Sequence, residues 1–266
     1  MENSPLVSII TIVYNGEKYI ENAIRSVIDQ SYNNIEYIII DGGSSDNTIS
    51  IIKKYEKQIA LWISEKDKGI GDAFNKGIAR ASGEIIGILN SDDWYEKDII
   101  EKIVANFKEY DVVYGDLQLW KADKKDFIFK GDHQSLTKEM RVNHPTVFVR
   151  KECYNRLGLF DLKYTVAMDY DLMLRFLVNK CRFKCIPEVL TNLRWQGNSD
   201  KKWLKGCQET LQIKNKYLPH KKLQNFFYFI KHVFTIGVLK FLIKVRMGFF
   251  IKIYRSHLAK VKKVYA

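Results

Sequence analysis

The sequence has little of what marks a zinc protein, a secreted protein or a membrane-spanning one. Its four cysteines (Cys153, Cys181, Cys185 and Cys207) form neither two C-x-x-C pairs nor a cluster with histidines. We therefore expect the reduced thiols of a cytosolic protein. No run of 18 uncharged apolar residues occurs, so a plain transmembrane helix is not expected. The first residues, MENSPLVSIITIVYN, lack the basic stretch that begins a cleavable signal.

Acidic residues are missing from the C-terminal part of the chain. The last one is Glu209, and residues 210–266 hold 13 Lys or Arg. Residues 1–209 hold 30 bases and 31 acids, so the formal charge of +12 belongs to the C-terminal part. Because the composition changes near Pro219, we predict a main domain over residues 1–218 and a basic extension over residues 219–266. A hydrophobic fraction of 46% excludes a disordered chain.

Strand-like and helix-like segments alternate over the first 115 residues. Continuous β-branched runs predict buried strands, and apolar residues at helical spacing predict helices. The predicted strands are residues 6–13, 35–40, 61–64, 84–89 and 112–114; the predicted helices are residues 17–30, 46–57, 68–82 and 97–109. Such repeated units predict an α/β fold with a parallel sheet. Beyond them, residues 117–130 resemble a hairpin, and helices are predicted at residues 169–179 and 199–217.

Polar residues follow the predicted strands, at the edge where α/β sheets bind ligands. After the first strand, Tyr14-Asn15-Gly16 does not match G-x-G-x-x-G, which disfavours a nicotinamide cofactor. After the second, Asp41 precedes two glycines, either in a plain turn or as an acceptor for a bound base or sugar. After the fourth come Asp92 and Asp93. A helix cap explains one aspartate, whereas two adjacent carboxylates suit Mg²⁺ or Mn²⁺.

Together, the strings VSIITIVYN, IIIDGGSSDNT and GIARASGEIIGILNSDDW resemble family 2 glycosyltransferases over roughly residues 5–200. The resemblance implies a GT-A-type, Rossmann-like sheet with helices on both faces. It also implies an inverting sugar transfer from a nucleotide diphosphate-sugar, with a UDP-sugar favoured. It assigns a nucleotide-base contact to Asp41, a place near the ribose or diphosphate to Asp92, and the Mn²⁺ or Mg²⁺ ligand to Asp93. The family often has an Asp where this chain has Asn90 and a second acid at Gly42, so those roles are not carried over.

The resemblance extends to two helix starts further along. In SEKDKGIGDAFNKG it implies donor contacts for Asp67 and Lys68, although Lys68 also fits a solvated surface lysine. In AMDYDLMLR, Asp169 matches the general base that takes a proton from the acceptor hydroxyl, with Met168 where relatives commonly have Glu. The helix dipole there predicts a lowered pKa for Asp169. A simple helix cap is the alternative.

Four more residues are implied to lie around the donor and the acceptor. Asp116 and His144 match positions that are polar in the family, although a histidine before proline is often a structural hydrogen-bond partner. The stretch RWQGNS is expected to close over the donor, with Arg194 at a phosphate, Trp195 on a sugar and Gly197 as hinge. An ordinary polar loop is the alternative.

The basic extension predicts an amphipathic helix. Lys240, Lys244, Arg255 and Lys262 share one helical face among aromatic and aliphatic residues. Such a helix lies in a membrane interface and is attracted to anionic lipids, unless it packs on the main domain or on another subunit. Because the resemblance is to polysaccharide-assembly enzymes, we expect a lipid-linked or oligosaccharide acceptor and a peripheral enzyme on the cytoplasmic face of a membrane.

Two other functions remain open at this point. A nucleotidyltransferase acting on sugar phosphates also joins an α/β sheet to metal-binding carboxylates. It would favour a basic glycine-rich loop after the first strand, where this chain has VYNGEKY. A nucleic-acid-binding module would use the basic extension and bind with steep salt dependence. It would leave the aligned carboxylates without a purpose, so we expect no nucleic-acid partner.

Overall fold

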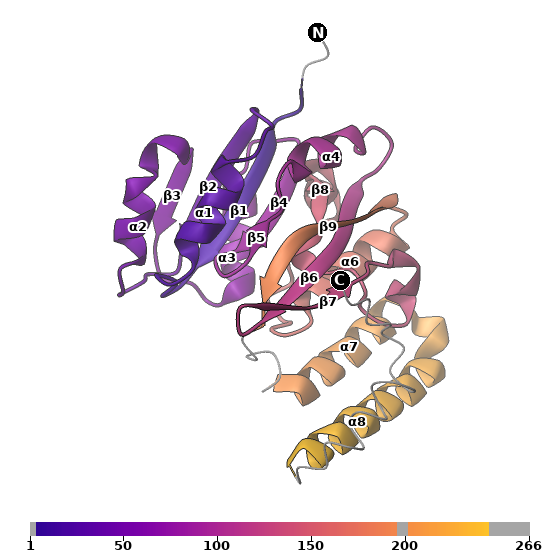
Figure 1. The fold of residues 1–266 in the computed structure, drawn as a ribbon. Coiled ribbons are helices and arrows are strands. Elements are labelled where there is room, and N and C mark those ends of the chain that lie inside the picture. The colour runs from indigo at the N-terminus through magenta and orange to yellow at the C-terminus, as the bar shows by residue number, and fades with distance from the viewer. Residues whose placement is uncertain (1–3, 196–201, 245–266) are drawn as a thin grey trace.

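The first predicted strand, β1 (Val7–Val13), lies inside the parallel half of a nine-stranded sheet (Figure 1). The computed structural model describes residues 4–195 and 202–244. In it, β1 pairs in parallel with β2 (Ile35–Asp41) on one side and with β4 (Ile85–Asn90) on the other, and β3 (Leu61–Ser64) continues the sheet beyond β2. The first four of the five predicted strands are thus confirmed. Their carboxyl ends point to one edge.

The second half of the sheet is mixed. Beyond β4 come β8 (Phe148–Arg150), β6 (Val112–Lys121), β9 (Phe183–Arg194) and β5 (Trp94–Tyr95), while β7 (Lys124–Phe129) forms the predicted hairpin with β6. Strand β8 runs antiparallel to both neighbours, and β6 and β9 are parallel. The fifth predicted strand is correct in position but continues to Lys121.

Helices cover both faces of the sheet, as predicted. Successive side chains of β1 point to opposite faces and contribute to two hydrophobic cores. Ile9 packs on the face covered by α1 (Ile20–Ile28), α2 (Thr48–Lys54) and α4 (Ile99–Ala105). Ile10 packs on the face covered by α3 (Ile70–Arg80), α5 (Lys151–Leu157) and α6 (Met168–Val178). A Cβ on Gly77 of α3 would lie 2.3 Å from Ile10 Cγ2, so glycine permits this close helix–sheet approach.

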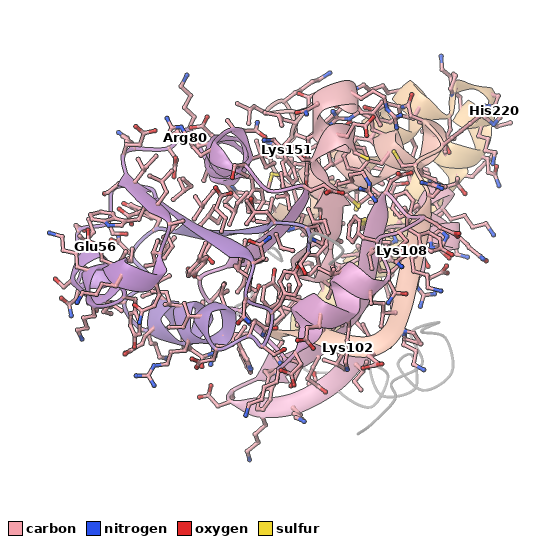
Figure 2. The ribbon with its side chains drawn as sticks, turned by 90° about the horizontal axis from the view of Figure 1, so that it is seen from above. Glu56, Arg80, Lys102, Lys108, Lys151 and His220 are labelled. Carbon is pink, nitrogen blue, oxygen red and sulfur yellow. The ribbon has the colours of Figure 1, made fainter. Side chains whose placement is uncertain are left out.

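Short 3₁₀ segments complete the chain path. They are η1 (Glu56–Gln58), η2 (His133–Thr137), η3 (His144–Thr146) and η5 (Pro219–Lys221). Viewed from above, Glu56 and His220 lie at opposite edges of the molecule (Figure 2). The segment η5 therefore lies far from the parallel half of the sheet.

Two long helices follow the sheet: α7 (Trp203–Tyr217) and α8 (Lys222–Lys244), joined by η5. They run antiparallel, because Lys214 Nζ lies 3.8 Å from the Tyr228 ring centre while Lys240 Nζ lies 5.9 Å from that of Trp203. Figure 1 shows the pair on the side of the molecule away from α2 and β3. None of the described helices is long and apolar enough to cross a membrane. Arg255 and Lys262, of the predicted basic face, lie outside the described residues, as does the side chain of Lys244.

Candidate active site

The largest feature at the carboxyl edge of the parallel strands is a cavity of about 1170 Å³. Its walls come from the segments after β1, β2 and β4, from the start of α3 and from the end of β9. Asp67, Asp92, Asp93, Arg194 and Trp195, all predicted from the sequence, line it. We call it the strand-end cavity.

Asp92 and Asp93 give this cavity its charge. Asp93 is 1% exposed; its carboxylate accepts hydrogen bonds from Asn90 Nδ2 (3.0 Å) and from the Arg194 backbone N–H (3.3 Å). Burial, reinforced by the neighbouring charge of Asp92, raises the pKa of Asp93 well above its usual value. Burial also raises the pKa of Asp92. Both carboxylates therefore lie where burial disfavours their charged form.

Arg194 lies across these carboxylates in an aromatic clamp that the sequence did not reveal. Its guanidinium carbon is 4.2 Å from the Trp94 ring centre and 4.5 Å from that of Tyr19. Its Nη1 donates to the Asp92 carbonyl oxygen at 2.9 Å. Stacking on both sides fixes the planar guanidinium at the cavity wall, where it can meet an anionic group.

The adjacent carboxylates fit a divalent cation. Among the described residues no cluster of three or more His, Cys, Asp or Glu side chains could hold a metal. The protein would therefore supply one or two carboxylate oxygens, which is how Mg²⁺ is commonly bound beside substrate phosphates. The raised pKa values of Asp92 and Asp93 indicate the same need for a positive partner.

Asp41 is buried beneath the loop after β2 and does not itself line the cavity. Its Oδ2 accepts from the backbone N–H groups of Gly43 (3.1 Å) and Ser44 (2.9 Å) and from Ser64 Oγ (2.6 Å), and its Oδ1 accepts from Ser44 Oγ. The carboxylate thus holds the loop whose glycines line the cavity. Its direct contact with a nucleotide base stays a prediction.

Asp67 and Lys68 stand at the entrance to α3. The Asp67 carboxylate accepts a hydrogen bond from Lys76 Nζ at 2.7 Å. A Cβ on Gly42 would lie 2.8 Å from Asp67 Oδ2. Glycine at position 42 therefore leaves room for the Asp67 carboxylate. Lys68 is exposed, and its backbone N–H donates to Asp72 Oδ2 at 3.0 Å. Both donor contacts remain predictions.

Asp169 lies in the first turn of α6, as predicted, but the expected lowering of its pKa is wrong. Burial raises the pKa of Asp169 to about 6, and the one backbone bond from the Tyr170 N–H (2.8 Å) offsets this only in part. Such a carboxylate is ionised at neutral pH and is basic enough to take a proton from a hydroxyl.

Glu209 of α7 holds the segment that directly precedes α6. Its carboxylate accepts from the backbone N–H groups of Thr165 (3.1 Å), Val166 (2.8 Å) and Ala167 (2.8 Å), directly before α6. These N–H groups lie just before the helix, whereas the N–H of Tyr170, in its first turn, donates to Asp169 itself. The last acid of the chain thus holds the segment that carries Asp169.

A second, smaller cavity of about 480 Å³ adjoins Asp169, between the start of α6 and the facing sides of α7 and α8. We call it the α7–α8 groove. Met168, next to Asp169 in the chain, packs with its Sδ against α3 at Gly71, where a Cβ would come within 3.2 Å. Gly69 and Ile70, just before it, line the strand-end cavity.

The remaining predicted residues lie further from both cavities. Asp116, 6% exposed, accepts from the Gly131 N–H at 3.0 Å, and burial raises its pKa. The His144 ring stacks on Phe74 with centres 4.8 Å apart, and burial lowers its pKa to about 4. His144 is therefore neutral at physiological pH. Residues 196–199 of the predicted closing loop, with the hinge Gly197, lie outside the described residues.

The sequence is similar to those of known glycosyltransferases. The family model described as glycosyl transferase family 2 matches residues 8–169. An uncharacterised glycosyltransferase of Rickettsia typhi is 35% identical over 191 residues, covering 65% of this chain and 59% of that protein. A Bacillus subtilis protein named "Putative teichuronic acid biosynthesis glycosyltransferase TuaG" is 44% identical over 101 residues, covering 37% of this chain and 40% of that protein. The chain thus spans about three fifths or less of these two relatives.

Solved structures share the fold. S. aureus TarS 1–349 in complex with UDP-GlcNAc has a TM-score of 0.61 at 21% identity, covering 78% of this chain and 65% of that one. The mannosyltransferase PcManGT of Pyrobaculum calidifontis, in complex with GDP-Man and Mn²⁺, has a TM-score of 0.65 at 17% identity, covering 86% and 70%. At these identities the likeness establishes the fold alone.

Proposed function

Because this chain belongs to glycosyl transferase family 2 and has its GT-A-type fold, we propose that it moves a sugar from a nucleotide diphosphate-sugar to an acceptor hydroxyl. The observation that carries the proposal is the placement of two kinds of carboxylate. Asp92 and Asp93 line the strand-end cavity, and Asp169, with a pKa of about 6, lines the α7–α8 groove.

The mechanism we propose is a single displacement with inversion. The acceptor hydroxyl attacks the anomeric carbon, its proton passes to a carboxylate oxygen of Asp169, and the bond to the nucleotide diphosphate breaks. Arg194, held between Trp94 and Tyr19, faces the diphosphate as charge develops on it. Asp93, with Asp92 beside it, would hold Mn²⁺ or Mg²⁺, whose Lewis acidity would neutralise the leaving diphosphate.

The donor we favour is a UDP-sugar. TarS binds UDP-GlcNAc and PcManGT binds GDP-Man, so the class of donor is shared while the base differs. The buried loop that Asp41 organises, with Gly42 and Gly43 at the cavity wall, is where we place the base.

The acceptor we propose is a glycan, lipid-linked in cell-surface polysaccharide assembly, reached from the cytoplasmic face of a membrane. The supporting feature is an apolar stripe on α8: Leu223, Phe227, Ile230, Phe234 and Phe241 are 48–70% exposed and follow one another at intervals of 4, 3, 4 and 7 residues. With the basic residues of the extension, this stripe suits an anionic membrane surface.

Screening nucleotide diphosphate-sugars tests the proposal. Wild-type protein with Mn²⁺ or Mg²⁺ should melt at a higher temperature with its cognate donor than without it, and EDTA should remove the shift. The donor should also hydrolyse slowly to free sugar and nucleotide diphosphate. If none of UDP-, GDP- and dTDP-sugars shifts the melting temperature or is hydrolysed, the proposed activity is wrong.

A further inference from the structure

The residues that line the α7–α8 groove indicate what kind of molecule it binds. Helix α7 lines it with residues on one face, among them Trp203, Cys207 and Thr210, and α8 contributes Tyr228 and Phe229. Most of this wall is aromatic or aliphatic. The groove begins at Asp169, the proposed base. A molecule bound in it would therefore reach the reacting carboxylate from the side of α7 and α8.

Lys214 puts a buried cation in this wall. The residue is 2% exposed; its Nζ donates to the Lys138 carbonyl oxygen at 2.9 Å and lies 3.8 Å from the centre of the Tyr228 ring. No described carboxylate makes an ion pair with it. Glu139, whose charge acts on Lys214, accepts from Tyr228 OH at 3.3 Å and lies 3.9 Å from Arg141 Nη1.

A buried ammonium without a counter-ion is costly, because burial removes the solvation of the charge. Burial lowers the pKa of Lys214 to about 8, so the group still carries its charge at neutral pH. An anionic group of a ligand would supply the missing partner. His232 also lines the groove, but burial lowers its pKa, so Lys214 and Arg141 are the cations there.

We infer that the α7–α8 groove binds the acceptor, and that this acceptor joins an apolar chain to a phosphate, which Lys214 contacts. The inference rests on the proposed transferase function and names its acceptor class. The apolar walls receive the hydrocarbon next to the phosphate, and the hydroxyl-bearing end lies at Asp169. The exposed stripe on the same helix α8 would set the mouth of the groove at the level of a membrane, where such amphiphiles reside.

Calorimetric titration of the full chain with farnesyl phosphate, below its micelle concentration, tests the inference. We expect binding to wild type, and at least about tenfold weaker binding to Lys214→Met, which removes the charge, and to Thr210→Phe, which fills the groove. The matched controls change exposed residues of the same helix pair, Lys231→Met and Gln212→Phe, and should bind as wild type does. Thermal melting of each variant verifies folding.

Farnesol has the apolar chain without the phosphate, and inorganic phosphate lacks the chain, so the two compounds test each part of the ligand separately. Both should bind at least about tenfold more weakly than farnesyl phosphate. If farnesol equals farnesyl phosphate, if inorganic phosphate equals it, or if all variants bind it alike, the inference is overturned. Wild type that fails to bind it overturns the inference as well.

Donor binding, measured on the same samples, keeps the two proposals apart. The strand-end cavity shares no lining residue with the groove, so Lys214→Met and Thr210→Phe should bind the nucleotide-sugar as wild type does. Donor binding without farnesyl phosphate binding removes the inference and leaves the transferase. The reverse result removes the transferase while a lipid-phosphate site remains.

Discussion

The two cavities differ in how the chain builds them. The strand-end cavity is lined mainly by short segments that directly follow β1, β2 and β4, and two of its carboxylates are adjacent in sequence. The α7–α8 groove is lined by side chains spaced along two helices and by loops up to a hundred residues away. The first is rich in carboxylates and suits a cation with a diphosphate. The second is apolar with a buried lysine. One fold thus has a cavity set by local motifs and a second cavity set by tertiary packing.

The largest effect should follow from the carboxylate between the two cavities. Asp169→Asn removes the general base and should lower the rate of sugar transfer by about 10²–10⁴-fold, while donor binding stays unchanged. Steady-state transfer assays on purified enzyme measure the rate. Asp29→Asn, an exposed change of the same chemistry at the end of α1, is the matched control. Near-wild-type transfer by Asp169→Asn would contradict the assignment.

The pH dependence should show the same carboxylate. Since burial raises the pKa of Asp169 to about 6, the base is progressively protonated below that pH. With donor saturating, kcat/KM for the acceptor should fall about tenfold per pH unit below pH 6 and be flat just above it. His144, with a pKa of about 4, adds no transition between pH 5 and 8. A profile that is flat from pH 7 down to pH 4.5 would exclude Asp169 as the base.

The donor side should respond more moderately to loss of the aromatic clamp. Arg194→Lys keeps the charge but loses the planar group that stacks between Trp94 and Tyr19. We expect about fivefold to tenfold weaker binding of the nucleotide-sugar by calorimetry, with farnesyl phosphate binding unchanged. Arg80→Lys, at the exposed end of α3 (Figure 2), is the control. Equal donor affinity in all three proteins would show that Arg194 does not face the donor.

The smallest effect concerns the support beneath Asp169. Burial alone would raise the pKa of Glu209, but the N–H groups of Ala167, Thr165 and Val166 outweigh it and hold the pKa below its usual value. The carboxylate therefore stabilises the fold at neutral pH, and this contribution is lost as the pH falls through the lowered pKa. Glu209→Gln should lower the free energy of unfolding in urea by about 1–3 kcal/mol at pH 7.

Glu109→Gln, an exposed change near the end of the α4 segment, should leave the stability within about 0.5 kcal/mol of wild type. If Glu209→Gln is as stable as this control, Glu209 does not hold the α6 start.

The sequence predicted the strands and the carboxylates of the strand-end cavity because their signals are local. Buried β-branched runs predict β1, β2 and β4 directly, and Asp92 and Asp93 follow β4 within three residues. Strand β9 was missed, because Pro187 interrupts it where its register with β6 shifts. Strand β8 has three residues and no pattern of its own.

The acceptor side was hidden for a different reason. Glu209, Lys214 and Tyr228 belong to helices whose packing against α6 no spacing in the sequence reveals. The expected lowering of the pKa of Asp169 was wrong because burial, which depends on this packing, outweighs the backbone N–H groups at the helix start. Local pattern thus located the catalytic candidate, and tertiary contacts set its chemistry.

Calorimetric titration of the cognate nucleotide diphosphate-sugar, with and without Mn²⁺, tests the division between the two sides most directly. Wild type and Asp169→Asn should bind the donor with equal, Mn²⁺-dependent affinity. Asp93→Asn should lose at least about tenfold in affinity and all dependence on Mn²⁺. Donor binding by Asp93→Asn that still responds to Mn²⁺ as wild type does, or its loss in Asp169→Asn, would contradict the account.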